Sequence, residues 1–128
     1  MNDNVLIFRY QEKTNSYYNL DVALTEEGEI EFNEGYYYPP QGDDEGQEYD
    51  YYLTIPATHF EEFVALLAAH CLEKEWHPQP DKELQLRELV AQLVVQGELG
   101  RSDTIRASLD TLQSWLDQAH IPYKQLFI

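Results

Sequence analysis

At Pro56 the spacing of apolar residues changes from every second residue to every third or fourth, and this change limits the possible folds. Before Pro56, apolar and polar residues alternate in 18–24 and 48–55, which is typical of half-buried strands. After it, the apolar residues recur with a helical period. Strands followed by helices predict an α+β class, with helices packed on one face of an antiparallel sheet. The 128 residues fit a single domain, 1–128.

Four strands are expected before Pro56, in 4–10, 18–24, 29–32 and 48–55. The turn before the third strand, Thr25 to Gly28, ends on a glycine suited to a positive φ. The segment 34–47 carries Pro39, Pro40, Gly42 and Gly46 among acidic residues, which predicts a loop. One face of this meander is expected to be in contact with water.

The first two helices follow Pro56. Thr58 and Glu61 have capping-box spacing, and the helix that they open is expected to end near Glu75. Asp81 is placed to cap the second helix, and Gly97 is placed to stop it. The apolar stripes expected to face the sheet are Phe60, Phe63, Val64, Leu67 and Cys71 in the first helix and Leu86, Leu89, Val90 and Leu93 in the second.

A third helix is expected to open at Ser102 or Asp103. Its apolar side comprises Ile105, Leu109, Leu112 and Leu116, with Trp115 beside them as a core residue. The segment 121–127 is predicted to return to the sheet as a short last strand. The expected order is therefore four strands, three helices and one strand.

Negative charge is concentrated in the first half of the chain. The formal net charge is −16, and residues 14–73 contain no Lys or Arg but fourteen carboxylates and eight of the ten tyrosines. Charge of this sign repels nucleic-acid phosphates and anionic lipids, so neither direct nucleic-acid binding nor membrane binding is expected. Without a secretory signal or a long apolar run, and with Cys71 as its single cysteine, the chain is expected to be cytoplasmic.

Motifs of enzymes, metals and cofactors are absent or incomplete, so no enzymatic activity, metal or cofactor is expected. His70 and Cys71 are adjacent and would point about 100° apart on a helix, while His77 follows the expected helix end. The acidic run from Asp43 to Glu48 contains a glycine but lacks the alternating ligand spacing of a calcium loop. A solvated loop is the simpler interpretation of that run.

Tyrosines and carboxylates alternate or adjoin between Glu34 and Tyr52, and this combination is typical of protein interfaces. Rings supply buried area, and carboxylates pair with Lys or Arg of a partner. Two other interpretations remain open: the triplet from Tyr36 to Tyr38 closes the core at the sheet edge, or the acids only solubilise the surface. The predicted partner-binding residues are Glu34, Tyr36, Tyr37, Tyr38, Asp43, Asp44, Glu45, Glu48, Asp50 and Tyr52.

Segment 17–22 carries two tyrosines in an expected strand, Gly28 lies in an acidic turn, segment 48–52 leads into a helix, and the final helix runs into Ile-Pro-Tyr at 121–123. In these four features the chain resembles immunity proteins of bacterial polymorphic-toxin and contact-dependent growth inhibition systems. The resemblance implies a cytoplasmic protein that binds and neutralises a cognate toxin domain, commonly a basic nuclease. The alternatives are an acidic adaptor, a DNA mimic and, less favoured, a small enzyme or ligand-binding domain.

Overall fold

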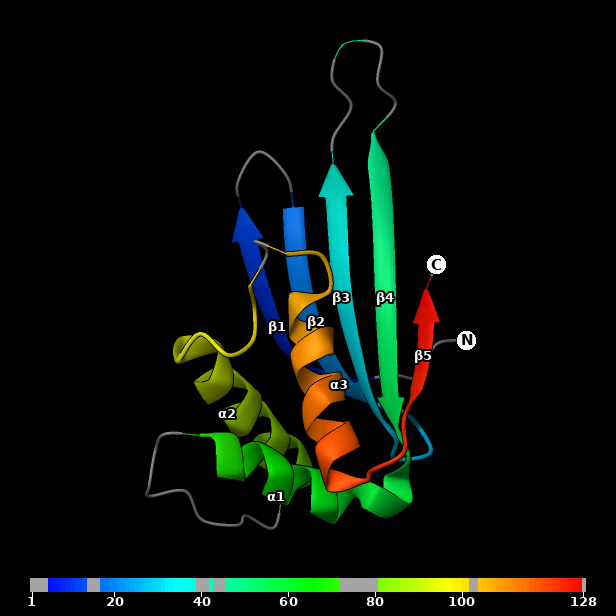
Figure 1. Ribbon diagram of the computed structural model, residues 1–128, viewed down its shortest axis with the longest axis vertical. Coiled ribbons are helices and arrows are strands. Elements are labelled where there is room, and N and C mark those ends of the chain that lie inside the picture. Colours follow the sequence, from blue (N-terminus) through cyan, green and yellow to red (C-terminus); the bar gives the residue numbers. More distant parts are fainter. Residues whose placement is uncertain are drawn as a thin grey trace.

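Two layers make up the protein in this computed structural model, a sheet and three helices that all pack on one face of it (Figure 1). The structure describes residues 5–13, 17–38, 42, 46–71, 81–101 and 104–127. The face toward the helices is called the inner face below, and the opposite face is called the outer face. The order of elements and the α+β class are those predicted from the sequence.

The sheet has five antiparallel strands in the order β1-β2-β3-β4-β5, so the order of the strands in the sheet is their order in the sequence. The last strand arrives after all three helices and pairs with β4 at one edge. The strands are β1 (Val5–Lys13), β2 (Tyr17–Leu24), β3 (Ile30–Tyr38), β4 (Gln47–Ile55) and β5 (Lys124–Phe127). The predicted turn between β2 and β3 is confirmed, with Gly28 at φ +83°.

The helices are η1, a 3-10 turn (Ala57–His59), α1 (Phe60–His70), α2 (Lys82–Val95) and α3 (Ala107–Ala119). Asp81 caps α2 as predicted, because its carboxylate accepts a hydrogen bond from the Leu84 amide at 3.1 Å. Gly97 follows the helix at φ +82°, a conformation that favours glycine. Among the described residues, no helix is both long enough and apolar enough to cross a membrane.

The core lies between the inner face and the helices. Alternate residues of β2 and β3, among them Leu20 and Phe32, are fully buried, and Phe32 meets Phe63 of α1 edge to face at 5.9 Å between ring centres. The predicted stripes of the helices are buried except for Cys71, which is half-buried, and Ile105, which is exposed. Trp115 is buried as predicted, at 7% exposure.

Element boundaries differ from the predictions at two points of α1. No side chain caps its first turn, because the chain after Pro56 forms η1 and the capping position falls on His59 rather than Thr58. The helix ends at His70, five residues before the predicted Glu75, and Cys71 is already extended. The pattern near Thr58 correctly marked the change from strand to helix but not the capping residue.

Two other segments also differ. The third strand continues to Tyr38 instead of ending at Phe32, because pairing with β2 on one side and β4 on the other holds it extended through the predicted loop. The third helix begins only at Ala107, and Ile105 lies before it with 51% of its surface exposed. The predicted start at Ser102 or Asp103 lies outside the described residues.

Candidate partner-binding surface

Strand alternation divides the predicted contact segment between the two faces of the sheet. Glu34, Tyr36 and Tyr38 of β3 point to the inner face, while Tyr37 of the same strand points outward. On β4 the outward residues are Glu48, Asp50 and Tyr52. The predicted residues Asp43, Asp44 and Glu45 lie outside the described residues.

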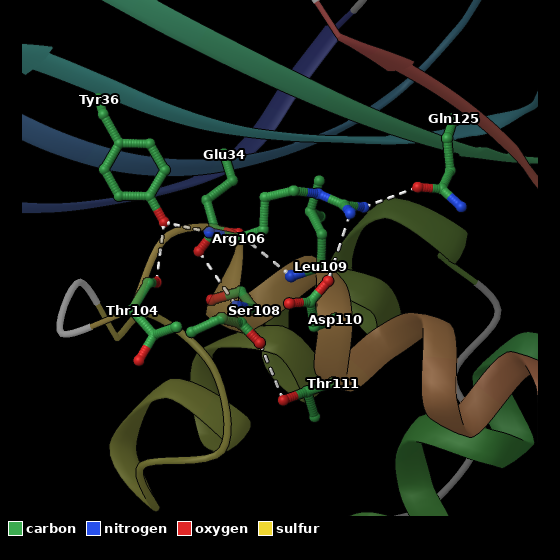
Figure 2. A network of polar contacts seen from close by, with 10 residues as sticks. Glu34, Tyr36, Thr104, Arg106, Ser108, Leu109, Asp110, Thr111 and Gln125 are labelled. Carbon is green, nitrogen blue, oxygen red and sulfur yellow. Dashed lines mark hydrogen bonds and ion pairs between the residues drawn. The ribbon is translucent and has the colours of Figure 1, made fainter.

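Glu34 is fully buried and closes the N-terminal end of α3 (Figure 2). Its Oε1 accepts a hydrogen bond from the Leu109 amide, and its Oε2 accepts one from the Ser108 amide, each at 3.1 Å. The Tyr18 hydroxyl donates a third, at 2.5 Å. The first amides of a helix have no partner within the helix, so this carboxylate supplies from the sheet a cap that the helix lacks.

Tyr36, two residues after Glu34 in β3, forms hydrogen bonds with the segment at the same end of α3. Its hydroxyl accepts a hydrogen bond from the Arg106 amide at 2.8 Å and donates one to the Thr104 carbonyl at 3.3 Å (Figure 2). Arg106 has a left-handed backbone, at φ 64°. Glu34 and Tyr36 together therefore position the start of α3 over the sheet.

The prediction that Glu34 and Tyr36 contact a partner needs correction. Their exposed fractions are 0% and 4%, and their polar atoms are bonded within the protein. Sequence placed them in a loop, where alternation would not apply, whereas they belong to a strand with one covered face. For Tyr36 the structure agrees with the alternative that part of the tyrosine triplet closes the core.

The pKa values of Glu34 and Tyr18 are changed by their buried surroundings. Burial raises the pKa of the Glu34 carboxyl, although the hydrogen bonds from Tyr18, Leu109 and Ser108 act in the opposite direction. Burial followed by the nearby Glu34 charge raises the pKa of the Tyr18 hydroxyl far above its usual range. Tyr18 therefore stays protonated and available as a donor to Glu34 throughout the ordinary pH range.

The outer face carries a connected polar network across four neighbouring strands. Arg9 of β1 holds Asp21 of β2 through two hydrogen bonds of 2.8 and 3.1 Å. Asn19 donates to Asp21 and to Asn33 of β3, and Asn33 donates in turn to Asp50 of β4 at 3.2 Å. The polar groups of this face are thereby held in one arrangement before any partner arrives.

Gly35 lies beneath this network, in β3. A methyl group at its Cα would lie 2.7 Å from Asn19 Oδ1 and 2.9 Å from Asp50 Oδ1. The missing side chain lets an amide oxygen and a carboxylate oxygen from the flanking strands converge over the backbone. At this point no side chain of β3 projects from the outer face, and two acceptor oxygens lie close together.

Tyr52 is surrounded by negative charge on the same face. Burial comes first among the causes that raise the pKa of its hydroxyl, followed by the charges of Asp50, Glu31, Asp21 and Glu48. A hollow of about 220 Å³ adjoins it, lined by Leu6, Arg9, Asp21, Ala23, Glu31, Asn33 and Tyr52. This surface can accept cationic groups and hydrogen-bond donors around one aromatic ring. We call Asp21, Glu31, Glu48, Asp50 and Tyr52 the acidic face.

Exposed rings lie near this surface. Tyr17 and Tyr37 are cross-strand neighbours on the outer face, with ring centres 5.8 Å apart and exposed fractions of 46% and 39%. Tyr37 is thus the member of the predicted tyrosine triplet that faces away from the helices. On the inner face Tyr49 packs between Tyr38 and Phe127, at 6.1 and 6.4 Å.

Sequence reasoning did not select Arg9, Asp21, Glu31 or Asn33 as site residues. The signal was present, because Asp21 and Glu31 alternate with buried Leu20, Val22, Ile30 and Phe32 and so share the face away from the core. What sequence did not supply was the register, which places Asp21 opposite Asn33 and Asn33 opposite Tyr52.

The described His and Cys residues that were considered as metal ligands contact other groups in the structure. The His70 ring stacks on Trp115 at 3.8 Å, and the Cys71 Sγ lies 3.9 Å from the Leu89 carbonyl oxygen. Within the described part of the chain, no three side chains among His, Cys, Asp and Glu are grouped to hold a metal ion. His77 lies outside that part.

No protein-family description, no curated protein and no solved structure matches this chain.

Proposed function

We propose that this chain is a cytoplasmic immunity protein that binds and neutralises a cognate basic toxin domain, such as a nuclease, by occluding its active site. The observation that carries the proposal is the acidic face. Four carboxylates surround Tyr52 on a side of the sheet that none of the described helices covers (Figure 1). The resemblance of the short motifs to immunity proteins agrees with this assignment.

A basic nuclease and an acidic surface attract each other through the charges that the nuclease needs for its substrate. An enzyme that cleaves nucleic acid presents cationic groups to phosphates, and those groups attract a surface of opposite sign. The net charge of −16 accelerates encounter with such a partner, and the exposed rings of Tyr17 and Tyr37 supply area to bury once contact is made. A preformed polar network lowers the cost of ordering the surface on binding.

A binding role also agrees with the state of the most perturbed carboxyl. Glu34 has the altered pKa expected of a catalytic acid, but its oxygens are occupied by the Tyr18 hydroxyl and two helix amides. It does not line the hollow beside Tyr52. Its contacts stabilise the fold and leave no oxygen presented to a substrate.

The test is co-expression and pull-down with the protein encoded immediately upstream, combined with a growth-protection assay. The double variant Glu31→Lys with Glu48→Lys reverses two charges of the acidic face. Its matched control, Glu61→Lys with Glu98→Lys, makes the same charge change at exposed positions in α1 and after α2. A third variant reverses Asp43, Asp44 and Glu45 and tests the predicted loop.

We expect the outer-face variant to weaken binding about 10- to 100-fold and to abolish protection, since each reversal replaces attraction with repulsion. The control is expected to stay within about threefold, and wild-type binding is expected to weaken as salt is raised. Equal loss in both double variants would contradict the assignment of the acidic face. Binding of similar strength to unrelated basic proteins such as lysozyme and histone would instead favour a DNA mimic.

A further inference from the structure

One edge of the sheet is only half covered. β4 pairs with β3 along its whole length, from Gln47 to Ile55. On its other side β5 pairs only with Tyr51 to Thr54. Among the described residues, no strand lies beside Gln47–Asp50 on that side, and Figure 1 shows β5 ending halfway along β4. Such an edge presents backbone donors and acceptors that can template another strand.

The two faces at this open edge differ sharply in chemistry. Glu48 and Asp50 belong to the acidic face. On the inner face, Tyr49 and Phe127 lie nearly parallel, with ring centres 6.4 Å apart, and 59% of Phe127 is exposed. Tyr51 continues the row, since it stacks on Phe127 at 4.8 Å. A strand that extended the line of β5 would therefore meet carboxylates with one side and aromatic rings with the other.

We propose that β4 accepts an extended strand of the basic partner at Gln47–Asp50, collinear with β5. The strand would alternate Lys or Arg on the outer face with apolar residues on the inner face. The inference rests on the proposed function and specifies how the partner is held. Backbone hydrogen bonds provide affinity at the edge, and the two chemically different faces select the side-chain pattern.

A second copy of this chain is a poorer occupant of the same edge. Pairing β4 with β4 would bring Glu48 and Asp50 of one copy close to the same residues of the other, and like charges across strands are destabilising. A basic strand turns the same carboxylates into attractive partners. Charge complementarity therefore favours the basic occupant.

The experiment uses the full chain and three synthetic eight-residue peptides, acetylated and amidated. The first alternates Lys and Val. The second and third have the same sequence with N-methyl groups on every Lys or on every Val, which blocks one or the other backbone edge without changing charge. Affinity is measured by titration, and hydrogen exchange is measured for the amides of Gln47–Asp50.

We expect the first peptide to bind and to slow exchange of the β4 amides that face away from β3 by at least tenfold. One of the two methylated peptides should lose at least tenfold in affinity and the other should keep it, because only one edge of the added strand contacts β4. The variant Glu48→Gln should weaken binding of the first peptide severalfold, whereas Glu61→Gln should not.

Three results would overturn strand addition. The first is that the unmethylated peptide does not bind at millimolar concentration. The second is that both methylated peptides lose affinity, or that neither does. The third is that the chain forms a dimer in which the amides of Gln47–Asp50 are protected from exchange. Equal binding of all three peptides would contradict strand addition at β4 but would still agree with the acidic face as the binding surface. The proposed function itself fails separately, when Glu31→Lys with Glu48→Lys still protects cells from the toxin.

Discussion

The Oε1 atom of Glu34, in the middle of β3, accepts a hydrogen bond from the amide of Leu109 in the first turn of α3. The two residues are 75 positions apart in the sequence. A buried carboxylate from the sheet thus does the work that a capping Ser, Thr or Asp does from within the chain. The same contact explains why an acidic residue inside the segment predicted to contact a partner is fully buried.

Replacing Glu34 with Gln is expected to lower the free energy of unfolding by about 2 kcal/mol. The side-chain amide keeps one acceptor oxygen but places an NH2 group against a backbone donor, so either the Ser108 amide or the Leu109 amide loses its partner. Urea denaturation measures the change. Glu48→Gln makes the same chemical change at an exposed position of β4 and should stay within about 0.5 kcal/mol. A similar loss in both variants would contradict the capping role.

The pH dependence of stability should reveal Glu34 independently. Burial raises its pKa in the folded protein above the unfolded value, so the folded state binds the proton more tightly. Stability from this group is therefore complete below the unfolded pKa and declines as pH rises through the folded pKa. The difference in unfolding free energy between wild type and Glu34→Gln should grow in favour of wild type as the pH is lowered through that window. A difference independent of pH would contradict the shift.

Tyr36 and Tyr37 form a matched pair of neighbours with opposite surroundings. Tyr36→Phe removes the acceptor of the Arg106 amide and the donor to the Thr104 carbonyl, and should cost about 1 to 2 kcal/mol in thermal or urea unfolding. Tyr37→Phe removes an exposed hydroxyl on the outer face and should be nearly neutral. If Tyr37→Phe proved the more destabilising, the assignment of the two faces would be wrong.

Comparing alanine variants of Gly97 and Gly100 distinguishes the cost of backbone strain from the cost of steric crowding. Gly97 and Gly100 have almost the same positive φ, +82° and +79°, but only Gly100 is enclosed: a Cβ there would lie 3.0 Å from Tyr10 Cδ2. Gly97→Ala should cost about 1 kcal/mol through backbone conformation alone. Gly100→Ala should cost at least about 1 kcal/mol more, because crowding adds to strain. Calorimetric unfolding of both variants gives the comparison, and equal costs would contradict close packing of Gly100 against Tyr10.

Most of the fold could be predicted because it depends on local periodicity. Alternation in 18–24 and the helical stripe through Leu86 and Leu93 each state which side of an element is apolar, and burial follows that side. Boundaries were less predictable where neighbouring strands decide them. β3 continues to Tyr38 because it is paired on both sides, whereas the prolines and glycines of 39–46 gave the whole segment 34–47 the composition of a loop.

For the candidate site, the sequence shows that acidic and tyrosine residues gather in the first half of the chain, and it predicts that one face of the sheet is in contact with water. Which of these residues stay exposed depends on how the strands and helices pack. Strand pairing sent Glu34 and Tyr36 beneath α3 and left Glu48, Asp50 and Tyr52 beside Asp21 and Glu31. The physical reason is that a side chain's chemistry is local, whereas its neighbours depend on register and packing between segments far apart in the chain.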